Sequence, residues 1–283
     1  MTAWMLRSNF VKASYDEVVV LFANTGEEDE RTLEFVRRCD RDFGFGTIWV
    51  EAVVNPKHGI GITHRVVNFK TASRKGEPFE AMIRKYGIPC SSFPSCTRDL
   101  KLNPMKSYLR SIGWAPRTYH TAIGIRADEI DRMNPAKDDL GIVYPCIEWL
   151  PVTKTQVNSF WANDAPFRLQ IRGYEGNCKT CWKKSKRKLM TIMLEHPERF
   201  DFFARMERHY AMVGPEFAKG DLPGYKRSFF RGGQSVSDLK KEVKKLPLTF
   251  VRAEDDRVKF DPDWDLGSSC EESCEVFSAE DLT

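Results

Sequence analysis

Two cysteines three positions apart, Cys178 and Cys181, lie directly before a run of positive charge in the segment GNCKTCWKKSKRK. Thiolates at this spacing can bind one metal centre. The flanking residues indicate a turn at a helix start, where the helix dipole stabilises negative charge. Three interpretations are open: half of a zinc site, part of an iron–sulfur cluster, or a basic helix that binds phosphate and also contains two thiols.

A third cysteine, Cys96, lies in the segment FPSCTRDLKLNPM, close to several basic side chains that include Arg98. A thiol beside cations has a lowered pKa and forms the thiolate needed for nucleophilic attack or metal ligation, so we predict that Cys96 is catalytic. The chain has no second C-x-x-C pair at zinc-ribbon spacing. Ligation by Cys96, with a fourth ligand from Cys270, Cys274 or an exogenous group, would instead suit an iron–sulfur cluster.

The bulk composition indicates a folded protein. The chain has 283 residues, of which 41% are hydrophobic and 30% are charged, which allows a substantial core. No apolar run is long enough to span a membrane, and the first residues do not resemble a signal peptide. We therefore predict a cytoplasmic protein without a membrane partner. In that compartment the eight cysteines are better suited to metal binding or catalysis than to disulfides.

Charge is distributed unevenly along the chain. Lys179 to Lys188 contains six basic side chains in ten positions, whereas the segment from Glu254 onward contains eleven acidic residues and two basic ones. A basic centre predicts a polyanionic partner, either a nucleotide or a nucleic-acid substrate bound through Lys179–Lys188. A solvated helix face followed by a mobile acidic tail would explain the same distribution.

The order of the expected elements predicts an α/β protein. Strands are expected over 17–23, 47–54, 118–125 and 142–147, and 64–69 is expected to be a short strand or an ordered loop. Helices are expected over 28–42, 77–86, 104–112, 152–162, 178–194, 197–212 and 235–245. This alternation predicts a doubly wound, mostly parallel sheet over 1–165, a helical cysteine-containing extension over 166–250 and an acidic, mobile tail over 251–283.

Polar loops follow several of the predicted strands. Ligands of open parallel sheets bind beyond the carboxyl ends of the strands, so these loops predict a nucleotide pocket. We assign nucleotide contacts to the loop after the first strand and to two arginines: Asn24, Thr25, Gly26, Glu27, Arg74 and Arg98. Arg74 lies beside a glycine in a loop suited to closing over phosphates. Catalytic roles beside Cys96 fall to the loop after the 118–125 strand: Arg126, Asp128 and Glu129.

Together these loops resemble the phosphoadenosine phosphosulfate (PAPS) reductase family of the PP-loop, or adenine nucleotide α-hydrolase-like, superfamily. The matching segments are VVVLFANTGEEDERTLEFV (Val18–Val36), FPSCTRDLKLNPMKSYL (Phe93–Leu109), IGIRADEIDRM (Ile123–Met133) and YPCIEWLPVTKTQVNSFW (Tyr144–Trp161). The segment GNCKTCWKKS (Gly176–Ser185) is similar to the phage and DNA-sulfur-modification (DndC-like) branch. The resemblance covers roughly residues 1 to 210.

The resemblance implies an adenine nucleotide, ATP or PAPS, at the Asn24–Glu27 edge, with Arg126 on phosphate. It also implies a cluster, of the 4Fe–4S type, held by Cys96, Cys178 and Cys181, with Cys274 as a candidate fourth ligand. Such enzymes reduce an activated sulfate or transfer sulfur after adenylating a substrate, and a homodimer is expected. The alternative is a catalytically impaired nucleotide- or nucleic-acid-binding relative, or a subunit of a nucleic-acid sulfur-modification complex.

The sequence departs from this family in two places. The catalytic E-C-G-L-H segment of the reductases is absent, and so are the family's first strand and its Ser-Gly-Gly phosphate loop. Met1–Phe10 is expected to form the helix that follows that loop. Loss of a central strand would leave open ladder edges on both of its neighbours.

Overall fold

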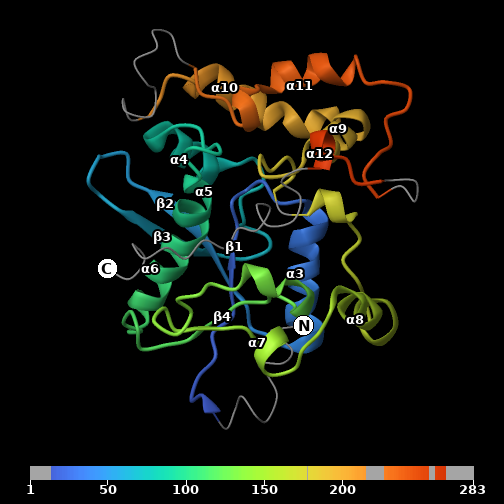
Figure 1. Cartoon of the computed structure of the whole chain (residues 1–283). Helices are drawn as coiled ribbons and strands as arrows, with labels where there is room; N and C mark the ends of the chain where they lie inside the picture. The colour runs from blue at the N-terminus through green and yellow to red at the C-terminus, as the bar shows by residue number, and fades with distance from the viewer. Residues whose placement is uncertain (1–13, 177, 215–225, 255–258, 266–283) are drawn as a thin grey trace.

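The structure is a computed structural model, and it describes residues 14–176, 178–214, 226–254 and 259–265 (Figure 1). The strands are β1 (Leu21–Ala23), β2 (Ile48–Val54), β3 (Ile62–Val67), β4 (Thr121–Ala122) and β5 (Ile142–Val143). The longer helices are α3 (Glu30–Phe43), α4 (Glu77–Tyr86), α6 (Asn103–Ser111), α8 (Lys154–Ser159), α9 (Lys186–Glu195), α10 (Asp201–Tyr210) and α11 (Val236–Val243). The short helices are α5 (Ser95–Thr97), α7 (Pro145–Glu148) and α12 (Pro262–Asp265).

Short turns of 3-10 or π geometry connect these elements. They are η1 (Arg98–Leu102), η2 (Ala127–Arg132), η3 (Phe160–Asp164), η4 (Gly173–Glu175), η5 (Pro197–Phe200) and η7 (Arg231–Gly233). The described residues therefore form a mixed α/β protein, as the sequence predicts.

The first sheet has the order β1–β2–β3, and it is parallel between β1 and β2 but antiparallel between β2 and β3. Helices cover both of its faces. Trp49 of β2 packs with Leu33 of α3 on one face, whereas Ala52 of β2 packs with Phe79 and Met82 of α4 on the other. Successive strand residues alternate between faces, which is why β2 is buried along most of its length.

The second sheet pairs β4 with β5 in parallel, and a hollow of about 390 Å³ separates it from the first sheet. Residues 18–21 line the hollow on one side, and Thr121, Ala122 and Gly124 line it on the other. β4 and β5 are shorter than predicted, because the chain from Pro145 turns into α7 instead of extending the strand. The described strands thus form two small, mostly parallel sheets, and one continuous sheet is not formed.

The helices after residue 185 gather at one end of the molecule, above α4 (Figure 1). Phe203 of α10 packs edge-to-face on Phe229 with ring centroids 4.3 Å apart, and both rings belong to the cluster that contains Phe79 of α4. The predicted helical extension therefore shares one hydrophobic core with the sheet-bearing part of the chain.

The described part of the predicted tail also packs on this end. Buried Arg187 of α9 forms an ion pair with Asp265 of α12, with 2.6 Å between Nε and Oδ1, and donates to the Val251 carbonyl at 2.8 Å. Residues 251–254 and 259–265 are thus held against α9. The remaining tail, which includes Cys270 and Cys274, lies outside the described residues, as does the helix expected over Met1–Phe10.

Most of the predicted helices are confirmed, and α4 begins and ends at the predicted residues. Thr153 caps α8, with its hydroxyl accepting from the Gln156 amide, as expected for a helix start. Among the helices that the structure describes, none is long and apolar enough to cross a membrane.

Candidate functional site

Three cysteines from two distant segments line one small cavity of about 20 Å³. Cys96 comes from α5, whereas Cys178 and Cys181 come from the loop that precedes α9. The other lining residues come from the loop after β1, α4, the segment after Cys96, the cysteine loop and α10: Thr25, Phe79, Thr97, Leu100, Lys101, Trp182, Lys183 and Phe203. The structure therefore brings together the three thiols that the sequence nominated as ligands.

Backbone contacts fix the cysteine loop onto the loop that follows β1. Glu28 and Cys178 form an antiparallel bridge, and the Lys179 amide donates to the Glu27 carbonyl at 2.9 Å. The Cys181 amide donates to the Cys178 carbonyl at 3.2 Å, which closes a tight turn. The prediction that a helix starts at these cysteines is wrong, because α9 begins only at Lys186, so its dipole does not act directly on the thiols.

Cys96 is positioned by a continuous helical stretch that contains a π turn. α5 runs into η1, where the Asn103 amide donates to the Arg98 carbonyl, and then into α6. π turns insert an extra residue into a helix and are frequent at functional sites. Here the turn directly follows the cysteine and includes Leu100 and Lys101, which also line the cavity.

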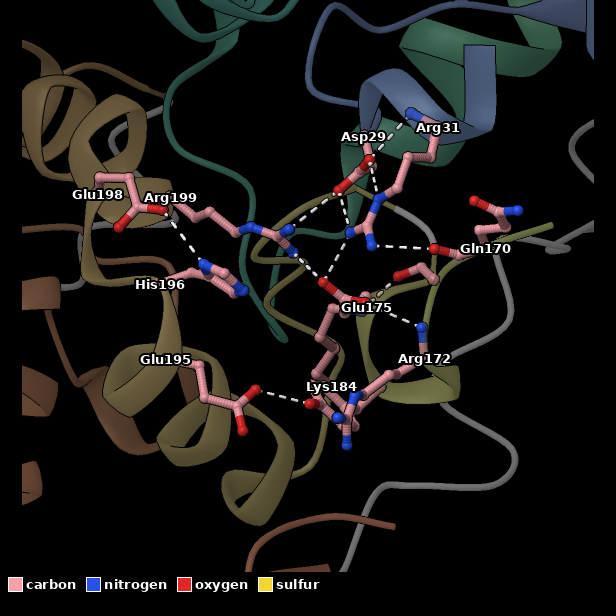
Figure 2. Close-up of polar contacts among 12 residues, drawn as sticks. Asp29, Arg31, Gln170, Arg172, Glu175, Lys184, Glu195, His196, Glu198 and Arg199 are labelled. Atoms are coloured by element: carbon pink, nitrogen blue, oxygen red, sulfur yellow. Dashed lines mark hydrogen bonds and ion pairs between the residues drawn. The ribbon is translucent and has the colours of Figure 1, made fainter. Parts of the chain in front are cut away.

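An ion-pair square anchors the segment that enters the cysteine loop (Figure 2). Arg31 and Arg199 each contact both Asp29 and Glu175, at distances between 2.8 and 3.0 Å. Hydrogen bonds from Arg31 lower the pKa of Asp29 to about 2. Burial alone would raise the pKa of Glu175, but the Arg172 amide and the two guanidinium groups lower it. Both carboxylates are thus ionised and matched by the two arginines.

The predicted nucleotide loop is buried, and its polar groups are engaged within the protein. The Thr25 and Gly26 amides donate to Glu28 Oε2 at 2.9 and 3.1 Å, and the Thr25 hydroxyl donates to Glu28 Oε1 at 2.8 Å. The Glu28 carboxylate therefore fills the position where such amides would bind an anion. A phosphate at this loop would have to displace it.

Asn24 serves as a structural anchor for the same loop. Its amide donates to Glu51 Oε1 at 2.6 Å and to the Ser73 carbonyl at 2.9 Å. Glu51 is fully buried in β2, and it also accepts from the Ser73 amide at 2.6 Å and from the Arg65 guanidinium at 2.6 and 2.9 Å. This carboxylate thus connects β2 to the loop beneath the cysteines.

Glu27 is buried close to the cysteine loop. Burial raises the pKa of its carboxyl to about 7, against the opposing effect of the Lys179 charge. The Glu27 backbone carbonyl accepts the hydrogen bond from the Lys179 amide. Glu27 is therefore a carboxyl that exchanges its proton near neutral pH beside the cysteine loop.

The remaining predicted polar residues lie away from the cavity lining. Arg74 forms a bidentate pair with Glu30 at 2.7 and 3.0 Å, and Arg98 contacts Asp99 at 2.9 Å. These contacts orient both guanidinium groups within their own loops. Their assigned nucleotide contacts stay predictions.

Arg126, Asp128 and Glu129 form a local cluster of their own. Arg126 lies 3.1 Å from Asp128 Oδ1 and 3.1 Å from Glu129 Oε2, and Glu129 also pairs with Arg132. The Lys154 amide donates to Asp128 at 3.1 Å, which ties the cluster to α8. The structure thus brings these three residues together, but none of them is among the residues that line the cysteine cavity.

The basic run after the cysteines packs inward. Lys183, Lys184 and Arg187 are buried; Lys184 donates to the Gly176 carbonyl, and Lys186 pairs with Glu242 of α11. Lys184, Lys186 and Arg187 are paired with a backbone carbonyl and with carboxylates of the protein itself. Half of the six cations of Lys179–Lys188 are thus buried, and the predicted nucleic-acid contact through this run stays a prediction.

Three residues next to the cysteines in the sequence have buried polar atoms without a partner among the described residues. Thr97 Oγ1, Thr180 Oγ1 and Trp182 Nε1 find no hydrogen-bond partner within the described residues. An indole N–H can only donate, and a buried unpaired donor costs roughly 1–3 kcal/mol. Two of these residues line the cavity together with Lys101 and Lys183. A donor-rich, positively charged wall around three thiols suits a bound sulfur-rich anion.

The shape of the cavity limits what could be held there. In the described part of the chain, no three His, Cys, Asp or Glu side chains converge on a single ion position. An iron–sulfur cluster distributes its thiolates over several iron atoms, so it does not need such convergence. A four-iron cluster exceeds a cavity of about 20 Å³, however, and would require the cysteine loop to move outward.

Sequence reasoning missed part of the cavity wall. Thr97 and Trp182 each directly follow a predicted cysteine ligand, and that adjacency was the available signal. Thr25 was assigned to a nucleotide, but its hydroxyl lies 3.6 Å from Cys178 Sγ. Phe79 and Phe203 close the cavity from α4 and α10, which no local pattern indicates.

The chain is similar to a phage protein. It is 29% identical to the "Uncharacterized nin region protein ORF290" of Escherichia phage lambda over 272 residues, which cover 93% of this chain and 87% of the phage protein. No protein-family model matches the chain, and no solved structure matches it. The likeness therefore extends over nearly the whole chain, and the name of the phage protein gives no activity.

Proposed function

We propose that the chain holds an iron–sulfur cluster at Cys96, Cys178 and Cys181 and acts as an oxidoreductase or sulfurtransferase on a sulfur-bearing substrate. The observation that carries the proposal is that these three cysteines line one cavity, although Cys96 and Cys178 are 82 residues apart in the sequence. The unpaired Thr97 and Trp182 donors support it, because hydrogen bonds to cluster sulfurs stabilise their negative charge.

Each residue of the wall has a distinct role in this proposal. The three thiolates would hold the cluster, Trp182 and Thr97 would donate to its sulfur atoms, and Lys101 and Lys183 would offset its net charge. The cluster would supply electron transfer or an iron that binds substrate sulfur. The protein's own contribution is to orient the group and to exclude water through Phe79 and Phe203.

An adenine nucleotide, ATP or PAPS, is the second part of the proposal. It rests on the resemblance to PAPS reductases, which implies an adenine nucleotide at the Asn24–Glu27 edge. In this chain the nucleotide would bind at the Asn24–Glu27 loop after Glu28 leaves its amides. Calorimetric titration with ATP and with PAPS tests this part separately, and absence of heat with both nucleotides would remove it.

Metal analysis tests the cluster. Protein purified without oxygen should contain iron and acid-labile sulfide in equal amounts and absorb visible light. Cys178→Ser should abolish both signals, whereas the matched control Cys90→Ser, a thiol outside the cavity lining, should keep them. Protein that binds one zinc without sulfide, or that binds no metal at all, would contradict the cluster.

A further inference from the structure

A basic surface lies beside the cysteine loop, on segments that the sequence did not single out. Two adjoining hollows, of about 730 and 290 Å³, share Arg31, Arg168 and Gln170 in their linings. Arg172 extends the surface into the first hollow, and Arg38 extends it into the second. We refer to this surface, lined by these four arginines, as the arginine groove.

Within the ranges that the structure describes, Arg38, Arg168 and Arg172 form no ion pair, and the last two side chains are exposed. Arg31 belongs to the balanced square with Asp29, Glu175 and Arg199 seen in Figure 2.

The other carboxylates that line the groove have cations or donors of their own. Glu30 pairs with Arg74, and Glu34 pairs with Arg37. Glu195 accepts from the Tyr174 hydroxyl at 2.6 Å and from Arg252 at 3.1 Å. The groove therefore has excess positive charge that faces solvent.

Aromatic rings adjoin this charge. The Arg38 guanidinium lies 4.3 Å above the Phe167 ring, and half-buried Phe35 lines the second hollow. Phe35 in turn packs against Trp161 with ring centroids 4.9 Å apart. Proteins that bind single-stranded nucleic acid without sequence preference combine a positively charged groove with aromatic rings on which bases stack. Phe35 is the ring of this set that lines the groove, since Phe167 is buried.

The groove adjoins the segment that enters the cysteine loop, because Glu175 lines its first hollow. Arg168 and Arg172 lie in an irregular segment whose four-residue separation spans at most about 13 Å. Two guanidinium groups separated in this way can contact different phosphates of one strand. The same segment continues through Glu175 to Cys178, six residues after Arg172. A strand bound in the groove would thus lie next to the cysteine loop.

We propose that the arginine groove binds the phosphate backbone of a single-stranded nucleic acid. The inference goes beyond the proposed function, because backbone binding does not require a metal centre, and either proposal can fail without the other. It also places the phosphate contact on exposed arginines, whereas Lys183, Lys184 and Arg187 of the Lys179–Lys188 run are buried.

Fluorescence anisotropy with a labelled 20-nucleotide single strand, measured over a series of salt concentrations, tests the groove. Arg168→Ala combined with Arg172→Ala should weaken binding at least tenfold and make the log–log salt slope shallower by about 1.4, since each phosphate contact contributes about 0.7. The control pair Arg110→Ala and Lys241→Ala removes two exposed charges from α6 and α11 and should change binding less than twofold.

Four results would overturn the inference. The first three are no binding by the wild-type chain at low salt, equal losses in the groove and control pairs, and tighter binding of a duplex of the same length. The fourth is equal competition by polyglutamate, because it would show that the groove recognises negative charge alone. Unfolding midpoints of all variants should match that of the wild type, since the substituted side chains are exposed.

Discussion

Replacement of Glu51 by glutamine should destabilise the protein strongly and disturb the cysteine cavity. The Glu51 carboxylate has no exposed surface, and it accepts from Asn24 Nδ2, the Ser73 amide and hydroxyl, and the Arg65 guanidinium. All of these groups donate. A glutamine amide has one oxygen, so its NH2 group would face donors in either orientation.

The size of the effect follows from the hydrogen bonds that glutamine cannot accept. If the NH2 group replaces Oε1, it opposes Asn24 and the Ser73 amide; if it replaces Oε2, it opposes Arg65 and the Ser73 hydroxyl. A buried donor left unpaired costs about 1–3 kcal/mol, so two such donors give a loss of roughly 3 kcal/mol. Arg65 is half exposed and can turn to water, which favours the second orientation and limits the loss.

Urea unfolding followed by circular dichroism measures this loss. With a slope near 3 kcal/mol per molar urea, the midpoint should fall by about 1 M. Glu34→Gln is the matched control, because it breaks an exposed helix pair with Arg37 and should cost less than about 0.5 kcal/mol. A Glu51→Gln midpoint within the error of the control would refute the role assigned to this carboxylate. Asn24 should also loosen, so metal retention by the variant should fall.

Three further predictions concern stability. Burial raises the pKa of Glu27 from its usual 4.5 to about 7, so the carboxyl binds its proton more tightly in the folded state. The free energy of unfolding should therefore fall as pH rises from about 4.5 through 7. Glu27→Gln should flatten that part of the pH profile of unfolding midpoints. Gly76→Ala would place a Cβ 2.2 Å from the Phe202 ring at φ +76°, and it should lower the free energy of unfolding by more than about 2 kcal/mol. The control Gly59→Ala, at φ +80° in open space, should lower it by about 1 kcal/mol in the same urea assay. Asp265→Ala leaves Arg187 buried without its carboxylate partner, so it should lower the free energy of unfolding, measured by thermal unfolding, by about 3 kcal/mol. A loss below about 0.5 kcal/mol would show that this contact is not formed.

Local sequence pattern was sufficient to predict much of the helical structure. Asp29 caps α3, Gly44 ends it in the left-handed conformation, and apolar residues recur on one face, so the helix was predictable within two residues at each end. α4 was predicted at its observed bounds, with a proline in its first turn and Gly87 after its last residue. The strands were less predictable, because an apolar run such as residues 17–23 does not reveal how many of its residues find a partner.

The candidate site was predictable only where chemistry is visible in the residue type. The three cysteines could be nominated because thiols near cations are chemically distinctive. The burial of Lys183 and Lys184 could not be anticipated, since it depends on packing of the cysteine loop against residues far away in the sequence. The arginine groove depends likewise on α3 and residues 168–172 meeting in space, with no motif in either segment.

Iron K-edge X-ray absorption on anaerobically purified protein tests the central claim most directly. We predict that sulfur is the dominant neighbour of iron, that a short iron–iron vector is present, and that iron–sulfur scattering falls in Cys96→Ser. A spectrum with only nitrogen and oxygen next to iron, or one that Cys96→Ser leaves unchanged, would contradict the assignment of Cys96, Cys178 and Cys181 as cluster ligands.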